Sequence, residues 1–262
     1  MENTLLNIDH LSVALDTPAG TVQAVRDVSL TLHEGEVLAL VGESGCGKSM
    51  LCRSIMKLLP KNAMITGGSI TVNGVDITGY RERDMRRLRG KVFSMIFQDP
   101  LTALDPAMPV GQQIAEAVRA HMGRMARGDV DSRVEELLAL VGVEPQRKGQ
   151  YPHQLSGGQR QRCLMAMALA GEPKILLADE PTTALDVTVQ AQILDLLRDI
   201  QRRLRTSTIL VSHDLGVVAR AADRVAIMYA GRIVEIGTAE EVYYDPRHPY
   251  TQGLLRSLPA LA

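Results

Sequence analysis

The sequence predicts an α/β fold in which short buried strands alternate with amphipathic helices. Residues 37–41 and 175–178 are continuous apolar runs, which are typical of strands buried on both faces of a parallel sheet. Helical patterns follow these runs, over residues 48–58 and 189–204. The chain has 262 residues, of which 45% are hydrophobic. It is therefore long enough to bury a sizeable core without disulfides or metal ions.

The N-terminal third adds strands of a different kind. Residues 5–15 and 22–32 alternate apolar and polar side chains around a turn with proline and glycine, which predicts an antiparallel hairpin. Residues 66–73 and 92–97 are expected to form further strands. Between them, residues 81–91 carry six basic and two acidic side chains. We interpret this segment as a solvated helix face rather than a nucleic-acid contact.

The middle of the chain predicts an inserted helical subdomain of about residues 100–170. Residues 111–171 are expected to be mostly helical. One helix is indicated by apolar side chains at i, i+3, i+4 and i+7, namely Val134, Leu137, Leu138 and Val141. Ser132 and Glu135 predict a capping box at the start of that helix.

The C-terminal third returns to strands and then becomes polar. Residues 208–212 and 224–228 have the pattern of strands, and residues 238–258 contain two short helical patterns. We therefore predict a single domain over residues 1–262, with a short C-terminal extension of about residues 238–262.

Charge and cysteine content argue against several classes of protein. The net charge of −1 disfavours a strongly basic nucleic-acid binder. Three cysteines without a C-x-x-C pair disfavour a disulfide framework or a structural zinc site, and they favour a reducing, cytosolic compartment. The N-terminus lacks the pattern of a signal peptide, and no run approaches 18 apolar residues.

A phosphate-binding loop is predicted directly after the first buried strand. Residues 42–49 fit the pattern G-x-x-x-x-G-K-[ST] between a strand and a helix, as that pattern requires. Its backbone N–H groups and the helix N-terminus would bind phosphate oxygens. Lys48 is expected to reach the β- and γ-phosphates, and Ser49 to hold Mg²⁺. The candidate nucleotide-binding residues here are Gly42, Glu43, Ser44, Gly45, Cys46, Gly47, Lys48, Ser49 and Met50.

Cys46 stands out within this loop because it precedes a helix. Helix N-termini lower the pKa of thiols, so we expect Cys46 to be sensitive to alkylation and protected by ATP. The alternative is an inert, small side chain.

Two carboxylates end the second buried strand. Asp179 is placed as the aspartate that supports Mg²⁺ in a nucleotide site. The following Glu180 is placed to polarise an attacking water molecule. Together with the phosphate loop, they predict a nucleoside-triphosphate hydrolase.

The sequence Leu155-Ser156-Gly157-Gly158-Gln159 identifies the family. It is accompanied by Gln98 after a strand, Pro181 after Glu180, Thr183-Ala184-Leu185-Asp186, and His213 after the strand at 208–212. In this order the motifs resemble the ATP-binding subunit of an ABC transporter over nearly the whole chain. The resemblance implies a P-loop NTPase core of the ABC type with an antiparallel β subdomain and a helical subdomain.

The resemblance also implies a head-to-tail dimer with two sandwiched ATP molecules. Each site would take the phosphate loop of one chain and LSGGQ of the other. The resemblance further implies that Lys48 binds phosphate, that Ser49 and Gln98 ligate Mg²⁺, and that Asp179 supports the metal. It implies that Glu180 is the general base and that His213 contacts the γ-phosphate. Asp186 would lie at the dimer interface, and the ATP of the partner subunit would be contacted by Ser156, Gly157, Gly158 and Gln159.

Two stretches, residues 98–106 and 247–255, resemble the dipeptide, oligopeptide and nickel importers. The resemblance implies a second, paralogous ATPase subunit, two transmembrane permeases and an extracytoplasmic binding protein. The chain would then lie peripherally on the cytoplasmic face of the inner membrane. The permeases would insert short helices near residues 98–110 and the helical region. Many peptide-importer members carry a cysteine cluster beyond the second stretch, and none follows here, so no iron–sulfur cluster is expected.

Several alternatives stay open at this point. Peptides and nickel or metal chelates are both possible cargoes, and the short tail resembles the nickel branch more. A lone His248 is not a nickel site. Leu15 stands where many members stack adenine on an aromatic ring, which leaves the preference for ATP over GTP open. A soluble ABC ATPase acting on nucleic acid or ribosomes is the alternative function. A P-loop kinase would leave LSGGQ unexplained.

Overall fold

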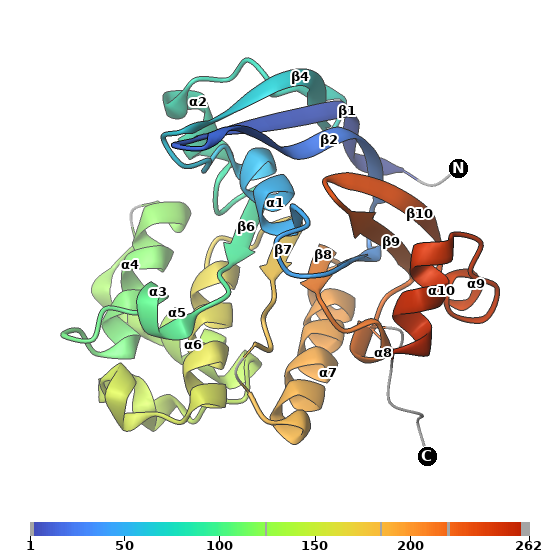
Figure 1. The fold of residues 1–262 in the computed structure, drawn as a ribbon. Coiled ribbons are helices and arrows are strands. Elements are labelled where there is room, and N and C mark those ends of the chain that lie inside the picture. The colour runs from blue at the N-terminus through green and yellow to red at the C-terminus, as the bar shows by residue number, and fades with distance from the viewer. Residues whose placement is uncertain (1–2, 124, 184, 219–220, 258–262) are drawn as a thin grey trace. The chain divides into compact units, whose positions relative to one another are not determined.

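The computed structural model describes residues 3–123, 125–183, 185–218 and 221–257. The chain forms two compact units (Figure 1). The first unit consists of two stretches, Met1–Arg86 and Ser207–Ala262, and the second unit consists of Arg87–Thr206.

An antiparallel sheet with the strand order β2-β1-β4-β5 forms one part of the first unit. Its strands are β1 (Thr4–Thr17), β2 (Gly20–His33), β4 (Ala63–Val72) and β5 (Val75–Asp76). β1 pairs with β2 across a tight turn and with β4 on its other side, so the predicted hairpin is confirmed. The apolar side chains of its buried face include Leu6, Ile8, Leu11, Val13, Val25, Val28 and Leu32.

Parallel strands form the other part of the first unit. β3 (Val37–Val41) lies between β8 (Ser207–Ser212) and β9 (Arg224–Tyr229) and is parallel to both. All residues of β3 and β8 are buried, and for β3 this agrees with its continuous apolar sequence. β10 (Arg232–Thr238) pairs antiparallel with β9. It was not predicted, because its side chains are only partly buried and its sequence shows no clean alternation.

The helices of the first unit follow these strands. They are α1 (Lys48–Met56), α8 (Leu215–Val218), α9 (Ala239–Tyr244) and α10 (Pro249–Arg256). α1 begins where the sequence predicts it. The two short helices near the C-terminus are confirmed, and α9 is capped by the side chain of Thr238.

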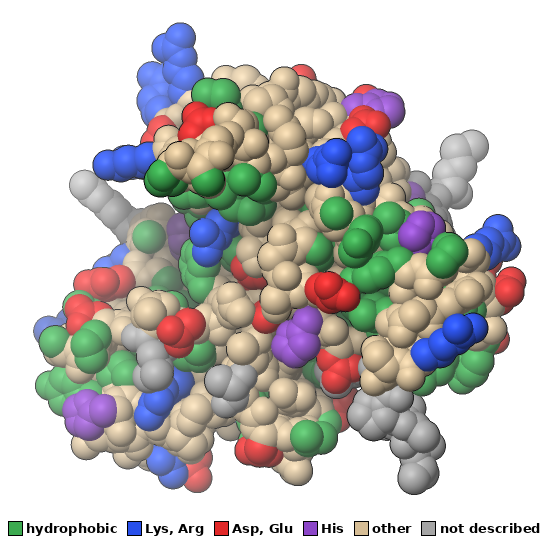
Figure 2. All heavy atoms as spheres, viewed as in Figure 1, with side chains coloured by type: hydrophobic (Ala, Val, Ile, Leu, Met, Phe, Trp, Pro, Cys, Tyr) green, Lys and Arg blue, Asp and Glu red, His purple; other side chains and the backbone are tan. Residues whose placement is uncertain are grey.

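The charged segment near residue 81 forms α2 (Glu82–Leu88). The side chains of Arg83 and Arg86 are 83% and 77% exposed, whereas Met85 is buried. Figure 2 shows Lys and Arg side chains projecting over the region where Figure 1 labels α2. The prediction of a solvated helix face is confirmed.

The second unit combines two parallel strands with a cluster of helices. The strands are β6 (Phe93–Ile96) and β7 (Ile175–Asp179). The helices are α3 (Pro100–Ala103), α4 (Val110–Met122), α5 (Arg127–Leu140), α6 (Gly157–Leu169) and α7 (Val187–Leu204), with the 3₁₀ turns η1 (Pro145–Gly149) and η2 (Pro152–Gln154). α4, α5 and α6 pack against one another. Where the structure describes the two units, none of their helices is long and apolar enough to cross a membrane.

The predicted capping box at Ser132 and Glu135 is wrong. α5 begins earlier, at Arg127, with Ala126 at the N-cap, so Ser132 lies inside the helix. The Glu135 carboxylate instead forms an ion pair with Lys148 at 2.7 Å. The helical pattern alone did not reveal that the helix already starts in the polar stretch before it.

Candidate functional site

The phosphate loop connects β3 to α1 in the first unit. Gly47 adopts φ 111°, and a Cβ at this position would lie 2.3 Å from the carbonyl oxygen of Ala24. Both facts require glycine. The loop thus turns sharply before α1 begins at Lys48, which places the N-terminus of α1 at the loop. Such a helix end attracts anions.

Lys48 is almost fully buried, with 3% of its surface exposed. Its Nζ donates hydrogen bonds to the carbonyl oxygens of Gly42 at 2.6 Å and Glu43 at 3.0 Å. The ammonium group is therefore held against the start of the loop by acceptors that it can exchange for phosphate oxygens.

Two hydrogen bonds also connect the loop to the C-terminal part of the chain, at Gly231 and Tyr250. The N–H of Gly231, between β9 and β10, donates to the carbonyl oxygen of Cys46 at 2.9 Å. The N–H of Glu43 donates to the hydroxyl of Tyr250 at 3.3 Å. Tyr250 was not among the predicted site residues, because nothing in the sequence places residue 250 beside residue 43.

The expected reactivity of Cys46 is not supported. Its side chain is buried, with 8% of the residue exposed. This burial raises the pKa of the Cys46 thiol above its ordinary value, and the nearby Lys48 lowers it by less. The alternative of an inert, small side chain fits better, because desolvation outweighs the effect of the helix N-terminus.

Glu180 is placed at the end of β7 by a strained backbone. It adopts φ 46°, in the left-handed region, directly after the buried Asp179. Its carboxylate oxygen Oε2 accepts hydrogen bonds from the Gln98 amide nitrogen and from the Thr183 hydroxyl, both at 2.9 Å. Two of the predicted site residues, Gln98 and Glu180, are thus brought together within the second unit. Thr183 was noted only as part of a motif.

The LSGGQ segment forms the N-terminus of α6. Ser156 is the N-cap: its hydroxyl accepts a hydrogen bond from the N–H of Gln159, whose side chain accepts from the N–H of Ser156. This is a capping box, which stabilises the first turn. Ser156 and Gly157 are exposed.

The two glycines of this segment lie close to the start of α7 and the residues just before it. A Cβ on Gly158 would lie 2.8 Å from Val189 Cγ1, and a Cβ on Gly157 would lie 3.3 Å from Leu185 Cδ2. Asp186 caps α7, since its side chain accepts a hydrogen bond from the N–H of Val189 at 2.9 Å. The predicted residues 156–159 and 186 therefore occupy neighbouring helix starts within the second unit.

His213 belongs to the first unit. It directly follows β8, as predicted, and its side chain is exposed. The chain turns here: the hydroxyl of Ser212 accepts a hydrogen bond from the N–H of Asp214 at 3.0 Å.

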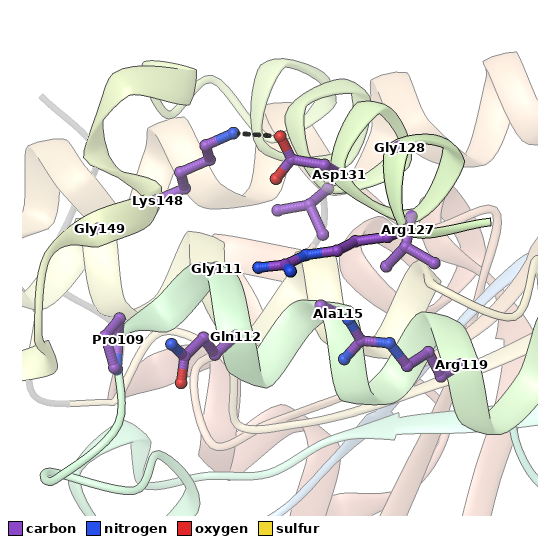
Figure 3. A pocket seen from close by; sticks show the side chains of 12 residues that line it. Pro109, Gly111, Gln112, Ala115, Arg119, Arg127, Gly128, Asp131, Lys148 and Gly149 are labelled. Atoms are coloured by element: carbon purple, nitrogen blue, oxygen red, sulfur yellow. Dashed lines mark hydrogen bonds and ion pairs between the residues drawn. The ribbon is translucent and has the colours of Figure 1, made fainter. Parts of the chain in front are cut away.

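A pocket of about 580 Å³ lies among α4, α5 and η1. Figure 3 shows the side chains of Arg119 and Arg127 extending into the space over α4. Lys148 pairs with Asp131 at 2.6 Å, so that positive charge is offset. In the described part of the chain, neither Arg119 nor Arg127 has an acidic partner within 4.0 Å. Among the described residues, the pocket therefore carries two guanidinium groups that form no ion pair.

Comparison with known families gives two matches. Residues 25–183 match the family described as ABC transporter. Residues 234–262 match the family described as Oligopeptide/dipeptide transporter, C-terminal region.

Among curated proteins, the chain is 54% identical to the Dipeptide transport ATP-binding protein DppD of Bacillus subtilis, over 98% of this chain and 77% of that protein. It is 52% identical to the Oligopeptide transport ATP-binding protein OppD of the same organism, over 98% and 72%. It is 49% identical to OppD of Salmonella typhimurium, over 99% and 77%.

Among solved structures, the chain resembles the ATP-binding cassette MJ0796, described as dimeric in a post-hydrolysis state with bound ADP and Pi. The TM-score is 0.80 and the identity 25%, over 90% of this chain and 99% of that one. It also resembles cbiO1 from Clostridium perfringens, part of the ABC transporter complex cbiONQ. Here the TM-score is 0.80 and the identity 29%, over 93% and 92%.

Proposed function

The chain belongs to the ABC transporter family, among the ATP-binding subunits of dipeptide and oligopeptide transporters, and from this we propose how it hydrolyses ATP and what the hydrolysis drives. It is an ATPase that couples ATP hydrolysis to transport. The observation that carries the assignment is a phosphate loop in one unit and a capped LSGGQ helix in the other, in a chain 54% identical to a dipeptide transport protein.

We propose that the nucleotide phosphates bind at residues 42–49. Support comes from the curled loop, the helix N-terminus at Lys48 and the ammonium group held nearby by two carbonyl oxygens. On binding, the Lys48 ammonium exchanges one or both carbonyl contacts for phosphate oxygens, which are stronger, charged acceptors. Met50 lies in the first turn of α1, so its backbone belongs to the helix N-terminus that we propose binds the phosphates.

We propose that the nucleotide binds with Mg²⁺. The donor set assigned to the metal is the Ser49 hydroxyl and the Gln98 amide oxygen, with Asp179 supporting it through water. These are all oxygen ligands, which suit Mg²⁺. In the ranges that the structure describes, no group of three or more His, Cys, Asp and Glu could hold a metal ion. When bound, Mg²⁺ neutralises charge on the phosphates.

We propose that Glu180 is the general base. Its carboxylate orients a water molecule toward the γ-phosphate and takes a proton from it as the oxygen attacks. The hydrogen bonds from Gln98 and Thr183 fix the direction of that carboxylate. We assign His213 to the γ-phosphate, which it contacts from the chain turn after β8.

We propose that two such subunits close head to tail on two ATP molecules. Family membership and the dimeric relative MJ0796 support a dimerising cassette. In this arrangement residues 156–159 of one subunit contact the ATP that the other subunit binds at its phosphate loop. The exposed Ser156 and Gly157 at the start of α6 suit that role. Asp186, next to this helix start, lies at the dimer interface.

We propose that the second subunit is a paralogue, and that the pair works beneath two permeases fed by an extracytoplasmic binding protein. The chain then sits on the cytoplasmic face of the inner membrane. Because Arg119 and Arg127 bring positive charge to the pocket among α4, α5 and η1, we infer that acidic groups of a permease segment enter it.

We also propose ATP rather than GTP as the nucleotide, because the relatives are named as ATP-binding proteins.

For the cargo we propose short peptides. The three relatives reported above are named for dipeptide or oligopeptide transport, and the C-terminal match is to that group. The resemblance of the short tail to the nickel branch finds no support among them. A soluble ATPase acting on nucleic acid or ribosomes has no support there either.

The test uses the complete transporter in liposomes with its binding protein. ATP hydrolysis is measured with a mixture of dipeptides and oligopeptides, and separately with nickel chelates. We expect stimulation by peptides alone. Stimulation by nickel chelates alone would overturn the cargo assignment and leave the motor role intact, whereas absence of ATP hydrolysis would overturn the motor role.

A further inference from the structure

We propose that Tyr250 is a positioning residue for the phosphate loop, and that it fixes the peptide group between Gly42 and Glu43. This deepens the proposed function and rests on it, because the loop is the one assigned to ATP. Tyr250 lies in the segment 234–262, which is shared with the dipeptide and oligopeptide group and to which no role is assigned. The segment would thereby act on the nucleotide site of its own subunit.

One peptide group of the loop is held at both ends. Its carbonyl oxygen, on Gly42, accepts a hydrogen bond from Lys48 Nζ at 2.6 Å. Its N–H, on Glu43, donates to the Tyr250 hydroxyl at 3.3 Å. A trans peptide group is planar, and its C=O and N–H point in opposite directions. Tyr250 therefore sets the direction in which the carbonyl points, and with it the place where the Lys48 ammonium rests.

Tyr250 itself is held firmly. Its ring packs on that of Tyr229, at the end of β9, with ring centroids 4.4 Å apart. Its N–H donates a 3.1 Å hydrogen bond to Nδ1 of His248, and this bond caps α10. The carboxylate of Glu235 on β10 accepts the N–H groups of Arg247 at 2.7 Å and His248 at 3.1 Å. The contact with Tyr229, the capped start of α10 and the hydrogen bonds to Glu235 on β10 together fix the position of the Tyr250 hydroxyl.

The middle of the loop is held by the same part of the chain. The N–H of Gly231 donates to the carbonyl oxygen of Cys46 at 2.9 Å. The start and the middle of the loop are thus both held by the part of the chain that runs from Gly231 to Tyr250. Burial raises the pKa of the Tyr250 hydroxyl, which keeps it neutral and able to accept the Glu43 N–H and to donate in turn.

The expected consequence is weaker nucleotide binding when the hydroxyl is removed. A loop that must be ordered on binding loses affinity relative to one that is already ordered. The loss of one neutral hydrogen bond corresponds to a roughly 2- to 10-fold change in affinity. Once ATP is bound, its phosphates hold the loop, so the rate of hydrolysis at saturation should change little.

The test compares Tyr250→Phe with wild type in the assembled transporter. Phe keeps the ring contact with Tyr229 and removes only the hydroxyl. We expect KM for ATP to rise roughly 2- to 10-fold, with kcat unchanged within about twofold. The matched control is Tyr244→Phe on α9, where the side chain is exposed and keeps its ring contact with Tyr243. The control should behave as wild type.

A second measurement separates this proposal from the motor role. Alkylation of Cys46 is followed by mass spectrometry without nucleotide, and it should be faster in Tyr250→Phe because the loop opens more often. Unchanged KM together with unchanged alkylation in Tyr250→Phe would overturn the proposal. An unchanged KM with a lowered kcat would also overturn it. Lack of ATP hydrolysis by wild type would instead refute the proposed function, while the alkylation result would still decide the role of Tyr250.

Discussion

The side-chain amide of Gln98 donates a 2.9 Å hydrogen bond to the carboxylate of Glu180, although 82 positions separate them in the sequence. Thr183 donates to the same carboxylate oxygen from three residues further along the chain. Glu180 adopts φ 46°, a conformation that costs a residue other than glycine about 1–2 kcal/mol. The two hydrogen bonds to the carboxylate, and the turn in which the Thr183 N–H donates to the Glu180 carbonyl oxygen, offset this cost. The two hydrogen bonds also fix the direction of the carboxylate.

The first prediction tests the role of this carboxylate. Glu180→Gln keeps the size of the side chain and removes the base, so ATP turnover should fall by roughly 10²–10⁴-fold. ATP should still bind, and the variant should accumulate as an ATP-bound dimer. Turnover is measured by phosphate release, and the dimer by size-exclusion chromatography with ATP. Glu240→Gln on α9 is exposed and serves as the control. Near-normal turnover in Glu180→Gln would remove Glu180 from its role.

The second prediction concerns Thr183, whose hydroxyl aims the carboxylate. Thr183→Val has the same shape without the hydroxyl. We expect kcat to fall about tenfold, the scale of one hydrogen bond to a charged group, with KM for ATP unchanged. Steady-state kinetics at saturating and limiting ATP separate the two constants. A rise in KM alone would show that Thr183 acts in binding rather than on Glu180.

How far the sequence alone leads depends on whether a feature is local. The hairpin, β3 and the phosphate loop were predictable, because alternation, a five-residue apolar run and glycine spacing are all local signals. The start of α5 was not, because the capping pattern at Ser132 has the same form inside a helix as at its start. Local patterns therefore give the elements better than their ends.

Contacts between distant residues were out of reach. The reactivity expected of Cys46 is not supported, since its position before a helix is visible in the sequence and its burial is not. Tyr250 was missed for the same reason: its partner lies 207 positions away. Gln98 was found only through the resemblance to a family, because a lone glutamine carries no signal.

The third prediction follows from the buried state of Cys46. Burial raises the pKa of this thiol, so less thiolate is present at neutral pH than in an exposed cysteine. Alkylation by N-ethylmaleimide should be slow near pH 7 and accelerate as the pH rises, at higher pH than for an exposed cysteine. Burial raises the pKa of Cys163 further, to about 12, so Cys163 should react later. Peptide mass spectrometry assigns each adduct.

The effect of nucleotide on Cys46 stays a prediction, and the same experiment tests it. Saturating ATP should slow the reaction of Cys46 and leave Cys163 unaffected. Fast labelling at neutral pH would contradict the buried environment. Labelling that persists unchanged with ATP would contradict the placement of the phosphates at this loop.

The fourth prediction tests the pocket among α4, α5 and η1. Reversing both charges, by Arg119→Glu and Arg127→Glu, should weaken binding to the permeases by roughly tenfold or more, because like charges then face each other. Arg202→Glu together with Arg203→Glu on α7, where both side chains are exposed, changes the net charge by the same amount and serves as the control. Co-purification of the subunit with the permeases at two salt concentrations measures the effect. Equal recovery of all variants would show that the permeases bind elsewhere.

The fifth prediction concerns the close approach of α6 to α7. Gly158→Ala would place a Cβ 2.8 Å from Val189 Cγ1, and valine has little rotamer freedom in a helix to move away. We expect a loss of about 1–3 kcal/mol in the free energy of unfolding, measured by denaturant titration. Val189→Ala removes the obstructing methyl, so the double variant should recover most of this loss. Such recovery is the sign of direct coupling.

Gly157→Ala is the matched comparison for that pair. Its Cβ would meet Leu185 Cδ2 at 3.3 Å, the end of a flexible side chain that can turn aside. Stability should therefore change by less than about 0.5 kcal/mol. If Gly157→Ala nevertheless lowers ATP turnover while Gly158→Ala/Val189→Ala keeps it, then Gly157 acts by letting the partner's phosphate approach α6. Equal destabilisation of Gly157→Ala and Gly158→Ala would instead mean that any side chain disturbs the capped turn, independently of Val189.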